Sequence, residues 1–543
     1  MIGLLHGYLL EGSGSNLWTR SIVIALVRSG ETVHLFCQEN HPEIYDFINE
    51  FRTYNQDGNV TVEFKRESPY KGDCIMHKPI LGNMIPVYVR DKYEEFSEVH
   101  PMIELETSIL EDYMEKNLRI LRQVIPEEGI QVLHANHAVL MSVVARRLQK
   151  ELNIPYVIMP HGSAIEYAVK KDERMYEWAH DAFINAQNIF VIGDEMVGRV
   201  KELFPKDDMV SKMIELNLGV DTELFNQVDL AGRRQKVDTV IEMVKGLEPG
   251  RVNSSLDLFN LELSQIDSQN QDDWVAVLRK LCDSYSHKKT DANLSEKLNT
   301  VNWEKDPIVL FVGRLINSKG AHAILGAFLS ILKDFPSTRF VLIGHGPQRE
   351  LIESILWAIR NKKYTEARLW AKWGGILEGN GEAPLDELII YWDELDKQGV
   401  LDKWFEDVSK VLKESSVIFT GYLTHDKLCH LFPCSDISAF PSVVAEAGPL
   451  VFLEAMASGS FPLGTYFAGM GASIDRVEEF ISKEAADKMK LRKEPEYLVE
   501  DLKSQLLKEL YHRGKYRDSL RQLAVEKYDW VSVGMKLRNA LLG

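Results

Sequence analysis

Two glutamates stand eight positions apart in the stretch EAGPLVFLE, Glu446 and Glu454. Pro449 suits a first helical turn and Gly459 ends the apolar run, so a helix is predicted between them. Glu446 then lies just before the helix and Glu454 more than a turn inside it. Free N–H groups near Leu450 suit a phosphate, and carboxylates accept hydroxyl hydrogen bonds. The pattern favours a sugar–diphosphate–ribose ligand; the alternative is glutamates beside a capped turn.

Arg314 and Lys319 bring two cations into the loop GRLINSKG, directly after the apolar run PIVLFV. Arginine offers a planar fork and lysine a mobile point charge, so the pair beside a helix start suits a pyrophosphate. The next strand ends in the glycine turn GHGP, Gly344 to Pro347. A solvated basic turn is the alternative interpretation.

A glycine loop also follows the first strand, in GYLLEGSGSN, where Gly12, Gly14 and Ser15 stand before a predicted helix. Backbone N–H groups in such a loop can approach an anion or a sugar closely. The spacing fits neither GxGxxG nor the P-loop, so a plain turn remains the alternative.

Histidines follow two further strands of the N-terminal part. His161 comes after PYVIMP, and His134 and His137 stand in LHANH after the strand QVL. A histidine hydrogen-bonded within its loop is the alternative for His161. His134 and His137 could bind a metal in principle, but no third ligand with clear spacing accompanies them.

Ligands of open parallel sheets bind beyond the carboxyl ends of the strands, so these residues can act together only if each follows a strand of such a sheet. Apolar strands alternate with amphipathic helices in the N-terminal part, with strands at Ile2 to Gly7, Thr32 to Cys37, Gln131 to His134, Tyr156 to Pro160 and Asn188 to Ile192. A second series opens at Pro307 and continues through RFVLIG, VIFTGY and ISAFPS. This alternation predicts an α/β fold with two parallel sheets, each covered by helices on both faces.

Two polar, helix-prone stretches interrupt this pattern, at residues 226–302 and at about 355–415. The predicted organisation is an N-terminal domain over 1–215, a helical insertion over 226–302, a second domain over 303–515 that contains the other insertion, and a C-terminal helical segment over 516–543. The insertions are interpreted as lids or as contacts between copies of the chain.

Composition narrows the class of partner. A chain of 543 residues with a net charge of −18 is repelled by nucleic acid and by anionic lipid surfaces. Its five cysteines lack metal-type spacing and suit free thiols in a reducing cytoplasm. The apolar runs are far too short to span a membrane, and the start MIGLLHGYLL is read as a strand and not as a signal peptide.

Taken together, FVGRLINSKG, GHGP, FPSVVAEAGPLVFLEAMASG and the earlier PHG resemble the retaining GT-B glycosyltransferases of family 4, which include sucrose-phosphate synthases and bacterial mannosyl- and glucosyltransferases. The resemblance covers most of the chain apart from the insertions. It implies two Rossmann-like domains facing across a cleft, a nucleotide-sugar donor held by the C-terminal domain and an acceptor on the N-terminal one. It also implies that the final helix, around Trp530 in the segment 516–543, returns to the N-terminal domain. The acidic balance of the chain favours a small polar acceptor.

The resemblance also implies roles for individual residues. Arg314 and Lys319 would bind the diphosphate and stabilise the charge that builds on it as it leaves, and Glu454 would bind the ribose. Glu446 would contact the donor sugar, as would His161 from the other domain. The remaining predicted donor contacts are Gly448, Leu450, Gly344, Gly14 and Ser15, and the predicted acceptor contacts are Gly12, His134 and Glu166.

The implied activity is a metal-independent hexosyl transfer without a cofactor, with UDP-glucose as the expected donor from its frequency in the family. Where the family often has E-x-F-G, this chain has EAGP, and Pro449 removes one N–H donor. Two other functions stay open: a non-hydrolysing nucleotide-sugar epimerase, and a non-catalytic protein that binds nucleotide sugars or acts as a scaffold.

Overall fold

The computed structural model describes residues 1–543 except 12, 56, 89–95, 217, 268–269, 286–287, 379–383 and 445–449, and except the side chains of 253–255. The chain divides into two compact units. Unit 1 joins Met1–Gly219 to Lys527–Gly543, and unit 2 comprises Val220–Glu526. Unit 2 is therefore inserted into the chain of unit 1.

Unit 1 is built on a sheet with the strand order β11-β10-β9-β8-β1-β2-β5-β3-β4. Its strands are β1 (Ile2–Leu5), β2 (Val33–Phe36), β3 (Glu50–Tyr54), β4 (Val60–Lys65), β5 (Cys74–Lys78), β8 (Val132–Asn136), β9 (Tyr156–Met159), β10 (Asn188–Val191) and β11 (Met213–Glu215). The edge strand β4 runs antiparallel to β3, and the other pairs are parallel. A small separate sheet pairs β6 (Met84–Val87) with β7 (Glu98–Pro101).

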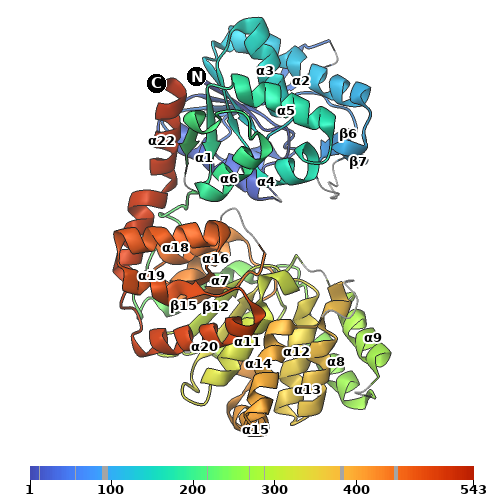
Figure 1. Cartoon of the computed structure of the whole chain (residues 1–543), viewed down its shortest axis with the longest axis vertical. Helices are drawn as coiled ribbons and strands as arrows, with labels where there is room; N and C mark the ends of the chain where they lie inside the picture. Colours follow the sequence, from blue (N-terminus) through green and yellow to red (C-terminus); the bar gives the residue numbers. More distant parts are fainter. Residues whose placement is uncertain are drawn as a thin grey trace. The chain divides into compact units, whose positions relative to one another are not determined.

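Helices cover both faces of this sheet because its central strands are buried on both sides (Figure 1). In β1, Leu5 belongs to the core on one face, and its neighbour Leu4 belongs to the core on the other. The helices are α1 (Gly14–Arg28), α2 (Thr107–Glu128), α3 (Met141–Leu152), α4 (Gly162–Ala164), α5 (Glu173–Asn185), α6 (Gly193–Leu203) and α22 (Trp530–Leu542).

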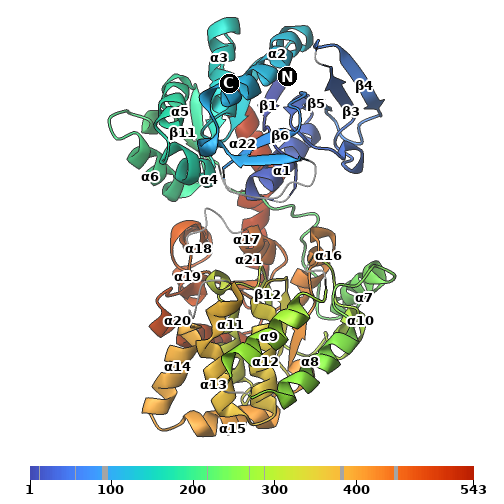
Figure 2. The ribbon, with the colours of Figure 1, turned by 90° about the vertical axis from the view of Figure 1, so that its right-hand side faces the viewer.

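The C-terminal helix α22 completes unit 1. It lies beside α1 (Figure 2), and Trp530, Val533 and Leu537 are buried in the core that α1 shares with the sheet. A Cβ at Gly534 would lie 2.8 Å from the Cβ of Ala25, so the glycine allows the two helices to approach closely.

Unit 2 has the strand order β14-β13-β12-β15-β16-β17, with parallel pairing throughout. The strands are β12 (Ile308–Val312), β13 (Arg339–Ile343), β14 (Val417–Phe419), β15 (Ile437–Phe440), β16 (Phe461–Thr465) and β17 (Lys490–Leu491). Numbered along the chain from one to six, this is the order 3-2-1-4-5-6 of a dinucleotide-binding fold. The order reverses between β12 and β15, which is where such sheets bind their ligands.

The helices of unit 2 include those of both polar stretches. They are α7 (Arg233–Val244), α8 (Asn253–Gln265), α9 (Gln271–Cys282), α10 (Leu294–Asn299), α11 (Ala321–Ile331), α12 (Gln348–Arg360), α13 (Tyr364–Lys372), α14 (Asp386–Lys397), α15 (Leu401–Val411), α16 (His425–Leu431), α17 (Leu450–Ala457), α18 (Ala468–Phe480), α19 (Lys483–Met489), α20 (Pro495–Tyr511) and α21 (Arg517–Leu523).

The two stretches pack on each other and on the sheet helices (Figure 1). Trp274 of α9 is fully buried, with ring centroids 5.9 Å from Trp370 and 5.5 Å from Trp373. His322 of α11 lies 2.6 Å from the carboxylate of Glu387 on α14, and both side chains are buried. These segments therefore contribute to the core of unit 2, which the interpretation as lids did not anticipate.

Asp436 links the starts of several elements of unit 2. Its Oδ2 accepts a hydrogen bond of 2.8 Å from the backbone N–H of Ile308, at the start of β12. Its Oδ1 accepts bonds of 2.7 Å each from Arg233 of α7 and from Arg513. Although burial acts to raise it, the pKa of Asp436 stays below its ordinary value because the two guanidinium groups stabilise the charged form.

Within the described residues, no helix is both long enough and apolar enough to cross a lipid bilayer. The architecture of two parallel α/β units confirms the predicted fold class at this level.

The close approach of α22 to α1 gives a direct test of how unit 1 is completed. Gly534→Val places methyl groups against Ala25, so we expect it to lower the free energy of unfolding by about 1–3 kcal/mol. Met535→Val, at a neighbouring exposed position, is the control and should change stability by less than about 0.5 kcal/mol. The measurement is chemical denaturation; equal stabilities of the two variants would contradict the packing.

Candidate functional site

The loops after β12 and β15 meet at the point where the strand order of unit 2 reverses. Gly320 has a φ of +71°, and a Cβ there would lie 2.3 Å from the carbonyl oxygen of Pro441. The N–H of Val443 donates a hydrogen bond of 3.0 Å to the carbonyl of Ser318. Glycine is therefore required at 320 for the two loops to touch. The result is a fixed crevice edge of the kind that holds phosphates in these folds.

Both predicted cations lie on the first of these loops. Arg314 is exposed, and within the described residues its guanidinium has no hydrogen bond or ion pair. Lys319 is half-buried and ends the 3₁₀ turn η5 (Asn317–Lys319). Glu378, which belongs to the second insertion, stabilises this turn by accepting a hydrogen bond of 2.6 Å from the N–H of Asn317. The loop therefore presents positive charge on a braced backbone.

Glu454 lies on α17, directly behind the loop after β15. Its side chain is 6% exposed, and Oε1 lies 3.1 Å from Nε2 of His425 at the start of α16. Its other oxygen, Oε2, is buried without a hydrogen-bond partner among the described residues. A buried carboxylate oxygen normally has a partner, so this atom is suited to accept a hydroxyl from a ligand.

The remaining predicted donor contacts of unit 2 have different surroundings. Gly344 has a φ of +136°, and a Cβ there would lie 1.8 Å from the carbonyl oxygen of Gly313, so the structure requires this glycine for packing of two loops. Leu450 is the first residue of α17. Glu446 and Gly448 lie outside the described residues.

Three histidines gather at the carboxyl ends of β1, β8 and β9 in unit 1. The His137 ring centroid lies 4.7 Å from that of His161 and 5.8 Å from that of His6. His137 has a φ of +72°, a backbone conformation that costs energy in a residue other than glycine and often marks functional sites. The Tyr8 and Tyr88 rings lie against His137 at 5.3 and 4.8 Å.

Burial keeps this cluster neutral. It lowers the pKa of His6 to about 4 and that of His161 to about 3, and it holds the pKa of His137 well below the ordinary value. His6 is fixed by its neighbours, with Nε2 3.0 Å from the carbonyl oxygen of Leu9 and Nδ1 3.2 Å from Asn136. Within the described residues, Nε2 of His161 has no partner. Such neutral imidazoles can hydrogen-bond to hydroxyl groups.

His134, a predicted contact of the acceptor, lies in the core of unit 1. It is fully buried, and its ring stacks on Trp18 and Phe190 with centroids 5.6 and 5.8 Å away. Burial lowers the pKa of His134 to about 4, and neither ring nitrogen has a partner among the described residues. The structure thus places His134 as a packing residue of the sheet, and its acceptor role stays a prediction.

The other predicted residues of unit 1 lie at helix starts. Gly14 begins α1 and is exposed, and Ser13 caps this helix by accepting the N–H of Asn16. Ser15 Oγ lies 3.0 Å from Ser13 Oγ. Glu166 lies in a π-helical turn, Ile165–Val169, 3.0 Å from the amino group of Lys170 and 3.6 Å from Arg199. Gly12 lies outside the described residues.

Residues described here in both units form no group of three or more histidine, cysteine, aspartate or glutamate side chains that could hold a metal ion. The described cysteines are all free thiols.

Sequence patterns missed His6 and Ser13 in unit 1, and Glu378 and His425 in unit 2. The capping serine was within reach, because Ser13 directly precedes a helix start. His6 directly follows β1, so its place at a strand end was also a signal. Glu378 and His425 depend on contacts between segments far apart in the chain. Glu378, for example, lies 61 positions from its partner Asn317.

Comparisons with known proteins identify a matching family model and solved structures with a similar fold. Residues 295–366 and 397–510, which lie in unit 2, match the family model "Glycosyl transferases group 1". A search of curated protein sequences returned no match.

Solved structures match nearly the whole chain. Sucrose-phosphate synthase from Thermosynechococcus elongatus is 14% identical, with 99% of this chain and 97% of that chain covered and a TM-score of 0.50. The catalytic domain of starch synthase IV from Arabidopsis thaliana, bound to ADP and acarbose, is 12% identical, with 99% and 98% covered and a TM-score of 0.51. The chain therefore has the two Rossmann-like α/β units of the GT-B glycosyltransferase structures, as predicted.

Gly320 allows the two loops of the crevice to meet, and Gly399 provides a matched comparison. Both have a φ near +71°, but a Cβ at Gly399 has nothing within 4 Å. We expect Gly399→Ala to cost about 1–2 kcal/mol of unfolding free energy from backbone strain alone. Gly320→Ala should cost more, because its methyl group also collides with Pro441. Equal losses in chemical denaturation would show that the loop contact is unimportant.

The buried His134 predicts a pH-dependent stability. Its pKa is about 4 in the folded chain and about 6.5 when unfolded, so only the unfolded chain binds the proton between these values. Stability should fall as pH drops from 6.5 to 4, by on the order of 3 kcal/mol for this group. His134→Phe, which keeps the stacking, should remove that part of the pH dependence. An unchanged profile would contradict this account.

Proposed function

We propose that the chain is a retaining hexosyltransferase that moves a hexose from a nucleotide-diphosphate sugar to a hydroxyl group of a small polar acceptor. One observation carries the proposal. Arg314 and Lys319 lie on the loop after β12, and Glu454, with its unpartnered oxygen, lies behind the loop after β15. A diphosphate binds cations, and the ribose next to it binds a hydrogen-bond acceptor such as a carboxylate, so a nucleotide sugar needs both groups close together.

In this proposal the cations provide most of the catalysis. When the bond between the sugar and the diphosphate breaks, negative charge builds on the leaving phosphate. Arg314, whose guanidinium has no partner within the described part of the chain, and Lys319 would stabilise that charge where it develops. The leaving phosphate would take the proton of the acceptor hydroxyl as the new glycosidic bond forms on the same face. Transfer would need no metal ion.

The other residues would position the donor. Glu454 would accept hydrogen bonds from the ribose hydroxyls through Oε2, with His425 holding Oε1. Glu446 would bind hydroxyls of the donor sugar, following the E-x7-E pattern of the resembled family. His161 would donate or accept a hydrogen bond as a neutral imidazole, because its pKa of about 3 leaves it uncharged at neutral pH.

We propose UDP-glucose as the first donor to test, from its frequency in the resembled family. For the acceptor we propose a small sugar, sugar phosphate or polyol, and for the site of action the cytoplasm. The net charge of −18 supports this acceptor class, since an acidic chain is repelled by the anionic surface on which lipid acceptors lie.

The test is release of nucleoside diphosphate from UDP-, GDP- and ADP-sugars, with and without pooled small acceptors. We expect release from one donor, and a rise when acceptor is present. Lys319→Gln and Glu446→Gln should each lower the rate at least about 100-fold, as expected for groups that stabilise developing charge or hold the reacting sugar. Glu454→Gln should mainly raise the KM for the donor.

Lys403→Gln, at an exposed lysine of α15, is the control and should behave as wild type. Turnover of donor that ignores acceptor would indicate an epimerase. Tight binding of a donor without turnover under any condition would indicate a non-catalytic binding protein. Full activity of Lys319→Gln would refute the role given to the loop.

A further inference from the structure

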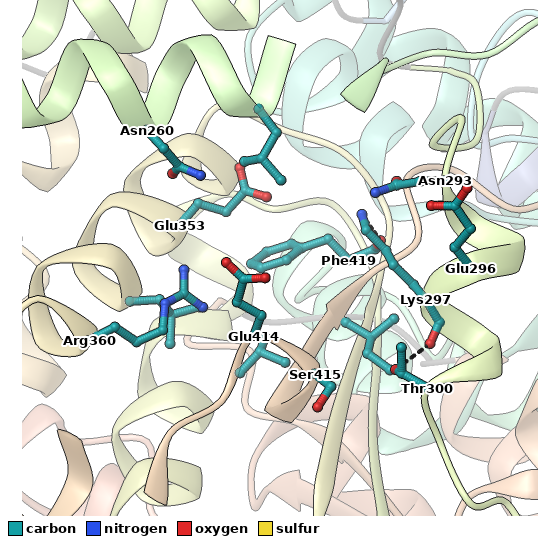
Figure 3. A pocket seen from close by; sticks show the side chains of 14 residues that line it. Asn260, Asn293, Glu296, Lys297, Thr300, Glu353, Arg360, Glu414, Ser415 and Phe419 are labelled. Atoms are coloured by element: carbon teal, nitrogen blue, oxygen red, sulfur yellow. Dashed lines mark hydrogen bonds between the residues drawn. The ribbon is translucent and has the colours of Figure 1, made fainter. Parts of the chain in front are cut away.

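We propose that unit 2 carries a second, non-catalytic binding site for a neutral saccharide or polyol, in a cavity at the outer edge of its sheet. The cavity has a volume of about 600 Å³ and is lined by residues of β14, α8, α10 and α12 (Figure 3). None of Arg314, Lys319 or Glu454 lines it, and β14 is the edge strand of the sheet. The cavity is therefore separate from the crevice where the strand order reverses.

The volume is within the range of small-molecule sites, roughly 300–1,000 Å³. The first insertion makes the site possible: Leu256 and Asn260 of α8 and Asn293 before α10 form one wall. Without these segments the edge of β14 would face solvent.

Arg360 is the most informative residue of the cavity. It is the last residue of α12 and reaches into the cavity (Figure 3). Within the described part of the chain its guanidinium makes no hydrogen bond and no ion pair, although the carboxylates of Glu414 and Glu353 act to raise its pKa. Arg360 is half-buried, and partial removal from water lowers the pKa of its guanidinium. Its N–H groups are therefore available to a bound group that accepts hydrogen bonds.

Two of the other charges of the cavity, Glu353 and Lys297, are held by buried partners, whereas Glu414 is exposed. Glu353 pairs with Arg251, and both side chains are nearly inaccessible to water. Lys297 donates a hydrogen bond of 2.6 Å to Asp291 and one of 3.0 Å to the carbonyl oxygen of Phe419. The cavity thus presents donors and acceptors at set positions, with cations on two sides and carboxylates between them.

The presence of both cations and carboxylates in the cavity indicates the chemical class of the ligand. An anion would meet Glu353 and Glu414, and a cation would meet Arg360 and Lys297. A hydroxyl group both donates and accepts, so a neutral polyhydroxyl compound can satisfy donors and acceptors together. The floor adds apolar contacts, among them Leu356 of α12 and the Phe419 ring, which suit the C–H face of a sugar.

The experiment is saturation-transfer NMR on the full chain with sucrose, maltose and glycerol as probes, and with inorganic phosphate, acetate and glycine for comparison. We expect transfer to at least one of the neutral probes. Arg360→Gln and Glu414→Gln should each weaken that binding at least about fivefold, since each removes a charge-assisted hydrogen bond. Glu414 is exposed, so its variant keeps the test valid if Arg360→Gln fails to fold.

Controls come from an exposed ion pair on α18, Arg476 and Glu479, whose glutamine variants should bind as wild type. Saturation transfer should also persist in Lys319→Gln, which disables the proposed diphosphate site. Binding of a neutral probe that Arg360→Gln and Glu414→Gln leave unchanged would assign the saccharide to another site, such as that of the proposed acceptor, and overturn the proposal. Binding of phosphate, acetate or glycine without any neutral probe, or of no probe, would also overturn it.

Discussion

Asp436 is the constraint on which the crevice of unit 2 depends. It stands at the start of β15, and its carboxylate binds the first N–H of β12, so it sets the register of the two strands between which the order reverses. Its own backbone is paired on both sides, with Ile308 and with Phe461 at the start of β16. Arg233, fully buried, and Arg513 neutralise the charge that this arrangement buries. The loops at the other ends of these strands can meet only because this register is fixed.

Much of the fold could be predicted from the sequence, because strands buried on both faces read as continuous apolar runs. The runs at Ile2, Gln131 and Pro307 became β1, β8 and β12, three central strands. The edge strand β4 escaped prediction because its residues are mostly exposed and carry no such run. The short strand β17 gave no signal either. Helical content in the two polar stretches was predictable, but their burial was not, because it depends on tryptophans that meet from different segments.

The candidate site was predictable to the extent that its residues follow strands. Arg314 and Lys319 lie in the loop after β12, and Glu454 lies on α17, the helix that follows the loop after β15. At Gly344 the sequence pattern and the structure suggest different roles. A glycine turn at this place resembles a ligand-binding loop, but in the structure the glycine allows two backbone segments to touch. His134 and His137 looked equivalent in LHANH, but alternation along β8 buries the first between two rings. The second lies past the strand end in a strained conformation.

The place of α22 in unit 1 has a consequence for synthesis. Unit 2 is continuous in the chain, from Val220 to Glu526, whereas unit 1 needs residues 527–543 to cover the core beside α1. Domains generally fold in order from the N-terminus as they leave the ribosome. Here part of the apolar surface of unit 1 stays uncovered while the more than 300 residues of unit 2 are synthesised. At ordinary rates of translation this takes about 15–60 s. The second unit can complete itself first, and α22 then closes the first.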